Sequence, residues 1–153
     1  MLKWLAVASL LLVALVVVYF VYLSWATRQH PVREAADRVI RPCPDKPNCV
    51  SSQDPRPGHA IAPLPLTNDR HDSDWKRLAD AIRAAGGDIL VDDGSYLHAV
   101  FTSTLFRFRD DLEAMIQENR IEMRSASRAG TSDLGVNRKR IEALRAAYLE
   151  QAD

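Results

Sequence analysis

The longest apolar stretch of the chain runs from Trp4 to Trp25 and contains no charged residue. As an α-helix this stretch is about 33 Å long at about 1.5 Å per residue, which is enough to cross a hydrocarbon layer of about 30 Å. Trp4 stands near one end and Tyr22 and Trp25 near the other, where aromatic rings prefer the lipid headgroups. The pattern predicts a transmembrane anchor over residues 1–26, followed by a charged juxtamembrane linker over residues 27–41.

A cleaved signal sequence is the alternative to a permanent anchor. Ser24 and Ala26 form a small-x-small pattern of the kind that precedes a cleavage site. The apolar region of a secretory signal spans about 7–15 residues, however, and this one is clearly longer. The length therefore favours an uncleaved anchor.

The polar and apolar positions of residues 42–153 alternate between helical and strand periods. Residues 72–87 have one apolar helical face and end in two glycines. Residues 88–108 contain two β-rich runs around a turn at 92–95. Residues 110–127 read as a second hairpin with its turn at 118–120, and a helix over the first half of this segment is the alternative. We expect an α+β fold in which an antiparallel sheet of about four strands is packed by two helices.

The second of these helices is predicted over residues 132–151, with Ser132 or Asp133 as its cap. Its apolar stripe consists of Leu134, Ile141, Leu144 and Tyr148, with Asn137 between them.

The chain has two cysteines, Cys43 and Cys49, in the proline-rich segment CPDKPNC. A disulfide between them closes a short ring that Pro44 and Pro47 already hold bent. Two free thiols, or a metal site with His59 as a third ligand, are the alternatives, although Cys-x5-Cys is not a standard zinc spacing. We interpret the pair as a disulfide and expect no metal or other cofactor.

Two arguments about membrane orientation conflict. Lys3 precedes the apolar run, whereas Arg28, Arg33, Arg38 and Arg41 follow it, and this count of positive charges favours a cytoplasmic carboxyl-terminal domain. A disulfide favours an oxidising compartment, and a short amino tail before a long span is typical of an inside-to-outside anchor. We predict a single-pass protein of the inner membrane with its carboxyl-terminal domain in the periplasm.

A basic and hydroxyl-rich segment, RSASRAGTSDLGVNRKR, spans the end of the last strand and the start of the last helix. Arg and Ser side chains there, together with the partial positive charge of a helix amino terminus, suit an anion. The alternative is a structural network in which the same residues pair with one another. We call this set the Arg/Ser surface; its members are Arg124, Ser125, Ser127, Arg128, Ser132, Asp133, Asn137, Arg138 and Arg140.

The segments CPDKPNCVSSQ and RSASRAGTSDLGVNRKRIEALR closely resemble the family catalogued as domain of unknown function 1499. The resemblance extends from about Pro42 to the carboxyl terminus. It implies an exported location and supplies no accepted activity. Many members have an aromatic residue before the Ser-Asp pair where this chain has Thr131, so a stacking role at that position is not expected here.

Three functions remain open. The sequence favours a membrane-anchored binding or assembly module whose Arg/Ser surface recognises an anionic small molecule, a lipid headgroup or an envelope protein. A hydrolase or transferase using His98 is an alternative, although no catalytic motif is present and adjacent Asp110 and Asp111 point to opposite faces of a strand. A purely structural envelope protein is the third. The balanced charge, with 20 basic and 20 acidic residues, gives no indication of a nucleic-acid partner.

Overall fold

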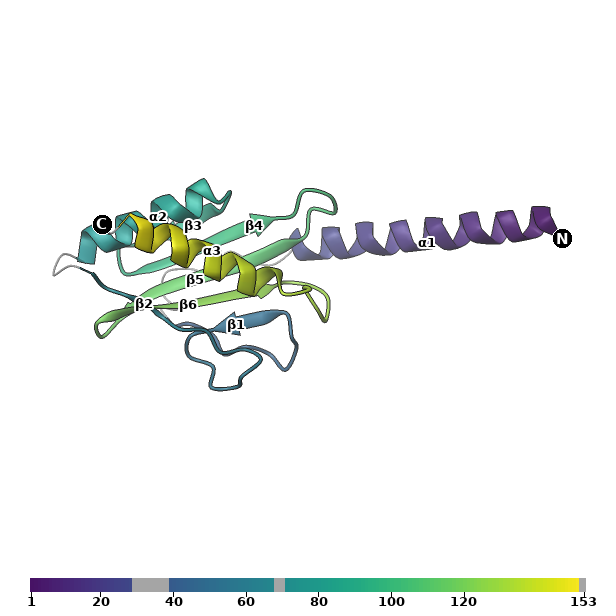
Figure 1. Ribbon diagram of the computed structural model, residues 1–153. Coiled ribbons are helices and arrows are strands. Elements are labelled where there is room, and N and C mark those ends of the chain that lie inside the picture. The colour runs from purple at the N-terminus through teal and green to yellow at the C-terminus, as the bar shows by residue number, and fades with distance from the viewer. Residues whose placement is uncertain (29–38, 68–70, 152–153) are drawn as a thin grey trace.

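The computed structural model describes residues 1–28, 39–67 and 71–151 (Figure 1). Most of the predicted juxtamembrane linker, residues 29–38, lies outside them. The elements in chain order are α1 (Leu2–Arg28), β1 (Cys49–Ser51), β2 (Leu64–Pro65), α2 (His71–Ala84), β3 (Asp88–Asp92), β4 (Tyr96–Thr102), β5 (Arg109–Gln117), β6 (Arg120–Ser127) and α3 (Val136–Glu150).

The strands form one antiparallel sheet in the order β1-β6-β5-β4-β3, with β2 also pairing β6. The two predicted hairpins are confirmed, since β3 pairs β4, β4 pairs β5 and β5 pairs β6 along the chain. The α+β fold is therefore confirmed. The sheet has six strands because β1 and β2 add two short edge strands to the predicted four.

The hydrophobic core lies between one face of the sheet and the helices α2 and α3 (Figure 1). Strand alternation directs every second side chain to this face, and Leu97, Leu112 and Met123 from three neighbouring strands are buried there. Ile141 and Leu144 of α3 pack against them. This core holds the sheet and both helices in a fixed relation, which in turn positions the loops at the sheet's ends.

Helix α1 projects away from one end of the domain, beside the loops that follow β4 and β6 (Figure 1). It is long and apolar enough to cross a membrane, and its apolar window is fully exposed, so it is not a core helix. Within the described part of the chain, its last turns are the part that contacts the domain. Thr27 and Ser24 are buried, and the Phe20 ring stacks on Phe106 with 4.6 Å between centroids.

Two predicted element boundaries were wrong. Strand β4 ends at Thr102 rather than continuing to Phe108, because the aromatic residues that follow pack against α1 instead of a neighbouring strand. Helix α3 begins at Val136, after Gly135 in a left-handed conformation. Leu134 therefore lies outside the helix and is 87% exposed, so it does not belong to the predicted apolar stripe.

The predicted disulfide is present between Cys43 and Cys49, whose Cα atoms lie 5.6 Å apart. Cys49 begins β1 and pairs with Ala126 of β6. Cys43, Cys49 and Ala126 form a small apolar cluster separate from the main core. The disulfide thus attaches the start of the domain to an edge of the sheet.

A substitution at Gly87, just after α2, tests how tightly α2 packs on the sheet. A Cβ atom at Gly87 would lie 2.7 Å from both Ile82 Cγ2 and Phe101 Cζ. We expect Gly87→Ala to lower the free energy of unfolding by about 1–3 kcal/mol, because overpacking forces neighbours out of their rotamers. Denaturant titration of the full chain in detergent measures this change. Gly58→Ala is the control, since its Cβ would meet no atom within 4 Å; equal effects in the two variants would contradict the packing argument.

Candidate functional site

The Arg/Ser surface divides between the two faces of the sheet. Side chains alternate along β6, so Ser125 and Ser127 lie on the α3 side and bond Asn137. Arg124 and Arg128 lie on the opposite side, where they bond carboxylates of β5. This alternation separates the guanidinium groups of β6 from its hydroxyl groups.

Asn137 joins β6 to the first turn of α3 and is fully buried. Its amide nitrogen donates to Ser127 Oγ at 3.0 Å, to Asp133 Oδ2 at 2.8 Å and to the Asn48 carbonyl oxygen at 3.1 Å. Its Oδ1 accepts a hydrogen bond of 2.6 Å from Ser125 Oγ. Gly135 occupies the N-cap position in place of the predicted Ser132 or Asp133, but Asp133 accepts the Asn137 backbone N–H in the first turn of the helix.

Arg140 extends this network toward β5. One terminal nitrogen of the guanidinium donates to Asn137 Oδ1 at 2.6 Å and to Ser125 Oγ at 3.0 Å. The second terminal nitrogen donates to Asp110 Oδ2 at 2.7 Å. The guanidinium also stacks over the Phe101 ring at 4.5 Å, a favourable cation–π arrangement. Its hydrogen-bonding capacity is thus largely directed at the protein itself.

Two further arginines of the set also have internal partners. Arg138 donates to the carbonyl oxygens of Ala60 and Gly58 at 2.9 and 3.0 Å, which ties α3 to the segment between β1 and β2. Arg124 donates to the buried Glu113 carboxylate at 2.9 Å. For these residues the structure has the ion pairs and hydrogen bonds of a structural network.

Arg128 connects the sheet to α1. Two of its guanidinium nitrogens donate to the Asp111 carboxylate: Nε lies 3.0 Å from Oδ1, and one terminal nitrogen lies 2.6 Å from the same oxygen. The remaining nitrogen donates to the Thr27 carbonyl oxygen at 3.1 Å. The last carbonyls of a helix have no partner within the helix, so Arg128 supplies one of the missing donors at the end of α1. His98 Nε2 approaches Asp111 Oδ1 at 2.8 Å from the other side.

Asp111 is held as an anion by these neighbours. Burial alone would raise the pKa of the Asp111 carboxyl, but hydrogen bonds from His98 and Arg128, together with the charge of Arg128, lower that pKa to about 2. His98 is only 2% exposed. The side chain on which the enzymatic alternative relies is therefore almost fully buried in this structure.

Some other guanidinium groups lack such partners, and the sequence reasoning did not single them out as site residues. Among the described residues, Arg28, Arg107 and Arg109 make no side-chain hydrogen bond or ion pair. They stand at the carboxyl end of α1, in the β4–β5 loop and at the start of β5, respectively. All three are therefore at the end of the domain that α1 adjoins.

A pocket of about 220 Å³ opens at this end, and we call it the α1 pocket. Its apolar wall consists of Phe20 and Leu23 of α1, Phe108 of the β4–β5 loop and Val136 of α3. Arg109 also lines it. The sequence does not reveal this pocket, because its walls come from segments far apart in the chain: α1, the loops after β4 and β6, and the first residue of α3.

The polar wall of the α1 pocket contains the hydroxyl groups of Ser103, Ser127 and Ser132. Each hydroxyl oxygen accepts a hydrogen bond: from Phe108 N, from the Asn137 side chain and from Leu134 N, respectively. A serine hydroxyl has one donor besides its acceptor lone pairs. Among the described residues, none of these three hydroxyls donates a hydrogen bond, so each O–H can still act as a donor.

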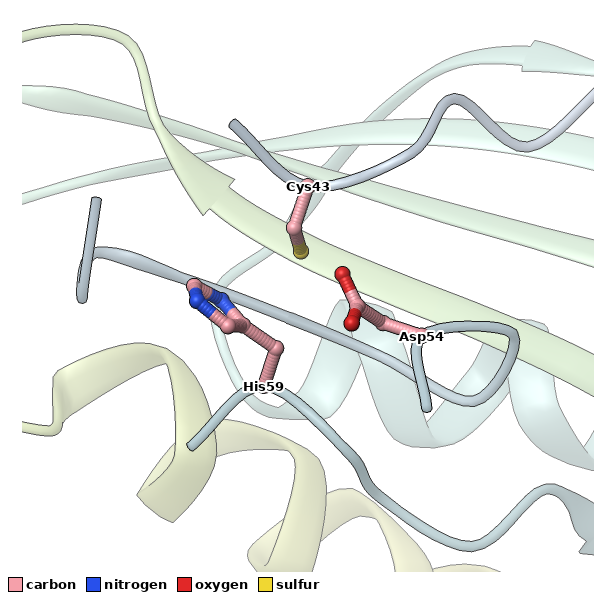
Figure 2. Close-up of side chains that lie close together, drawn as sticks. All are labelled: Cys43, Asp54 and His59. Carbon is pink, nitrogen blue, oxygen red and sulfur yellow. The ribbon is translucent and has the colours of Figure 1, made fainter. Parts of the chain in front are cut away.

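Cys43 and His59, which the metal alternative named, lie close together, and Asp54, which the sequence did not indicate, lies beside them. Figure 2 shows Cys43, Asp54 and His59 pointing toward one another, with ligand atoms within 4.8 Å. The Cys43 sulfur is bonded to Cys49, however, and a metal binds the thiolate form of cysteine. Asp54 is paired with Arg56 at 2.6 Å, and His59 Nδ1 lies 2.9 Å from the Cys49 carbonyl oxygen. With the disulfide formed, this cluster fastens the loop.

The Asp111 carboxylate gives a pH-dependent test. Because the folded pKa lies below the usual 3.8, Asp111 contributes stability above pH 4 that is lost as the pH falls toward 2. A shift of this size corresponds to about 2–3 kcal/mol. We expect Asp111→Asn to lower the unfolding free energy at pH 7 by about 3–5 kcal/mol, because it leaves the Arg128 charge buried without a partner.

The same variant should also flatten the loss of stability between pH 4 and pH 2. Denaturant titrations at several pH values measure both effects. Asp88→Asn, at an exposed position, is the control. If Asp111→Asn lost as much unfolding free energy between pH 4 and pH 2 as the parent chain, the stabilising role given to the ionised Asp111 carboxylate would be contradicted.

Comparison with known proteins places the chain in a family. No curated protein matches it. Residues 39–148, more than half of the 153 residues, match the family model described as Protein of unknown function (DUF1499). The matched region begins just before the disulfide and ends within α3, so it includes the whole sheet and leaves out α1. The chain therefore belongs to the DUF1499 family, as the two sequence motifs predicted.

Proposed function

We propose that this protein is a membrane-anchored binding module that takes an anionic amphiphile into the α1 pocket. Its domain would stand on the periplasmic side of the inner membrane, held there by α1. The bound molecule would be a phospholipid or a free amphiphile with a phosphate or carboxylate head, since these share the same recognition chemistry.

The contacts of α1 support a permanent anchor. Its last turns take part in the folded domain through the Phe20–Phe106 ring stack and the hydrogen bond from Arg128 to the Thr27 carbonyl oxygen. Cleavage after Ala26 would remove Phe20 and Leu23, and with them one wall of the α1 pocket. A chain that lost this segment would expose Phe106 and Phe108 to solvent.

The disulfide supports the periplasmic side. Cys43 and Cys49 are both buried and bonded. Disulfides persist in oxidising compartments and are rare in the cytosol. The arginines after the span favour the cytoplasmic side instead. We give the disulfide more weight than the arginine count, because the Cys43–Cys49 bond is part of a buried cluster of the fold.

The observation that carries the ligand proposal is the composition of the α1 pocket. An apolar wall from Phe20, Leu23 and Phe108 faces three serine hydroxyls and the unpaired Arg109. Ligand pockets combine apolar walls with a few convergent polar groups, and a guanidinium matches phosphate or carboxylate oxygens. Ser127, Ser132 and Asp133 of the Arg/Ser surface line this pocket, so part of that surface contributes to the proposed site.

Asp110 and Asp133 also line the pocket and would repel an anion if they were unpaired. Asp110 is neutralised by Arg140 at 2.7 Å. Asp133 accepts hydrogen bonds from the backbone N–H groups of Gly135 and Asn137. Arg109 therefore remains the pocket's charge available to a ligand.

Photo-crosslinking tests this site. The full chain in a neutral detergent is exposed to a diazirine-bearing alkyl phosphate, and the labelled residues are mapped by mass spectrometry. We expect capture at the walls of the α1 pocket. Loss of a charge-assisted hydrogen bond removes about 1.5–3 kcal/mol, so Arg109→Gln should weaken capture roughly tenfold or more.

Arg83→Gln is the matched control, because Arg83 is exposed on α2 and pairs only with Asp80. Equal capture by Arg109→Gln and the parent chain would refute the pocket assignment. A second arm uses photoreactive phosphatidylglycerol in nanodiscs. Capture of that lipid identifies a membrane source, whereas capture of the free alkyl phosphate alone identifies a soluble amphiphile.

Thiol labelling tests the proposed side of the membrane. In intact bacterial cells, a membrane-impermeant maleimide should label the full chain only after treatment with a reductant that opens Cys43–Cys49. The purified chain should be lighter by two hydrogen atoms than the fully reduced mass. Labelling restricted to a membrane-permeant maleimide, without reductant, would place the domain in the cytoplasm.

A further inference from the structure

The β4–β5 loop, residues 103–108, carries apolar side chains at its exposed tip. Leu105 is 80% exposed and Phe106 is 37% exposed. Elsewhere in the domain, aromatic and aliphatic groups of this size are mostly in the core. An exposed apolar tip on a soluble surface is unfavourable, so its surroundings in the membrane-bound protein decide its role.

The ring contacts of this loop fix its position along α1. Phe106 stacks on Phe20 at 4.6 Å, and Phe108 lies 6.0 Å from the same ring. Phe20 is within the uncharged run that ends at Trp25. At about 1.5 Å per residue, Phe20 lies roughly 7–8 Å below Trp25 and about 12 Å below Arg28 along the helix.

Trp25 and Tyr22 mark the headgroup level of the leaflet, because amphipathic rings prefer that depth. A ring stacked on Phe20 therefore reaches the boundary of the headgroups and the acyl chains. The neighbouring Leu105 is on the same loop and is directed away from the domain core, as its exposure shows. The loop cannot keep its contact with Phe20 and remain in water.

Beside this ring contact, α1 and the loop together line a groove of about 320 Å³. Phe20, Val21 and Leu105 give it an apolar part, while Arg28 and Arg107 give it two guanidinium groups. Neither guanidinium has an acidic partner among the described residues. A glycerophospholipid matches both parts, since its phosphate suits the guanidiniums and its acyl chains suit the apolar side chains.

We infer that the β4–β5 loop is a second membrane contact, which inserts Leu105 and Phe106 into the leaflet at the carboxyl end of α1 and seats a phospholipid phosphate between Arg28 and Arg107. This inference rests on the proposed membrane placement of α1, but not on a ligand in the α1 pocket. A second copy of the chain or a partner protein would have to enter the same leaflet to cover the loop. Lipid is already present at that depth.

Fluorescence quenching in vesicles tests the insertion. The full chain with Leu105→Cys, labelled with an environment-sensitive nitrobenzoxadiazole probe, is reconstituted into equimolar phosphatidylcholine and phosphatidylglycerol. The native cysteines are joined in the disulfide and do not react. Asn119→Cys is the matched control, because it is exposed in the β5–β6 turn at the opposite end of the sheet.

We expect the probe at position 105 to emit at shorter wavelength and to be quenched several-fold more by acyl-chain spin-labelled lipid than the probe at position 119. A chain that does not float with the vesicles would overturn both the anchor and this inference. A chain that floats but gives equal quenching at the two positions would overturn the inference alone. A blue-shifted probe at 105 without lipid quenching would show that protein covers the loop, and would also overturn it.

Native mass spectrometry tests the phosphate seat. The full chain extracted from the same vesicles should retain phosphatidylglycerol, and Arg28→Gln/Arg107→Gln should retain several-fold less. Arg83→Gln, an exposed arginine on α2, should retain the parental amount. Equal retention in the double variant and the parent chain would overturn the role given to the two guanidiniums.

Discussion

The bidentate ion pair between Arg128 and Asp111 is where the sheet, the end of β6 and the membrane-type helix meet. Both side chains are largely buried, with 3% of Arg128 and 17% of Asp111 exposed. The third guanidinium nitrogen of Arg128 donates to the Thr27 carbonyl oxygen in the last turn of α1. A buried charge is tolerated only when it is paired and hydrogen-bonded. The direction in which α1 leaves the domain therefore depends on this pair. Because α1 forms one wall of the α1 pocket and one wall of the groove beside the β4–β5 loop, both cavities depend on the pair as well.

The neighbouring residue Asp110 shows how the strand distributes its charges. Adjacent residues of a strand point to opposite faces, so Asp110 pairs with Arg140 on the helix side while Asp111 pairs with Arg128 on the other. One Asp-Asp step thus neutralises two arginines on two faces of one sheet. The Arg/Ser segment looks strongly basic along the sequence because its acidic partners are supplied by β5. Charge counted along a chain does not measure charge available at a surface.

The elements of the domain could be predicted where a local period controls them. Strand periodicity identified both hairpins, and the proline-rich segment around Cys43 and Cys49 identified the disulfide. The prediction failed where a distant segment replaces the expected neighbour. Phe106 and Phe108 look like strand residues, but their partner is Phe20, far away in sequence. Nothing in the sequence singled out Arg109, because whether an arginine has an acidic neighbour is decided in the folded chain.

The arrangement also constrains how a ligand could reach the α1 pocket. Phe20 contributes to both the pocket and the groove, and the β4–β5 loop stands between them. If Phe20 lies at the level of the acyl chains, the apolar end of the pocket opens toward the leaflet while Arg109 and the serines remain nearer the domain. An amphiphile could then enter head-first from the bilayer, while its tail stays among the acyl chains and does not cross water. Displacing an apolar chain into water costs about 0.8 kcal/mol per methylene, so this route avoids the largest barrier to binding such a ligand, and it requires that α1 and the domain remain joined.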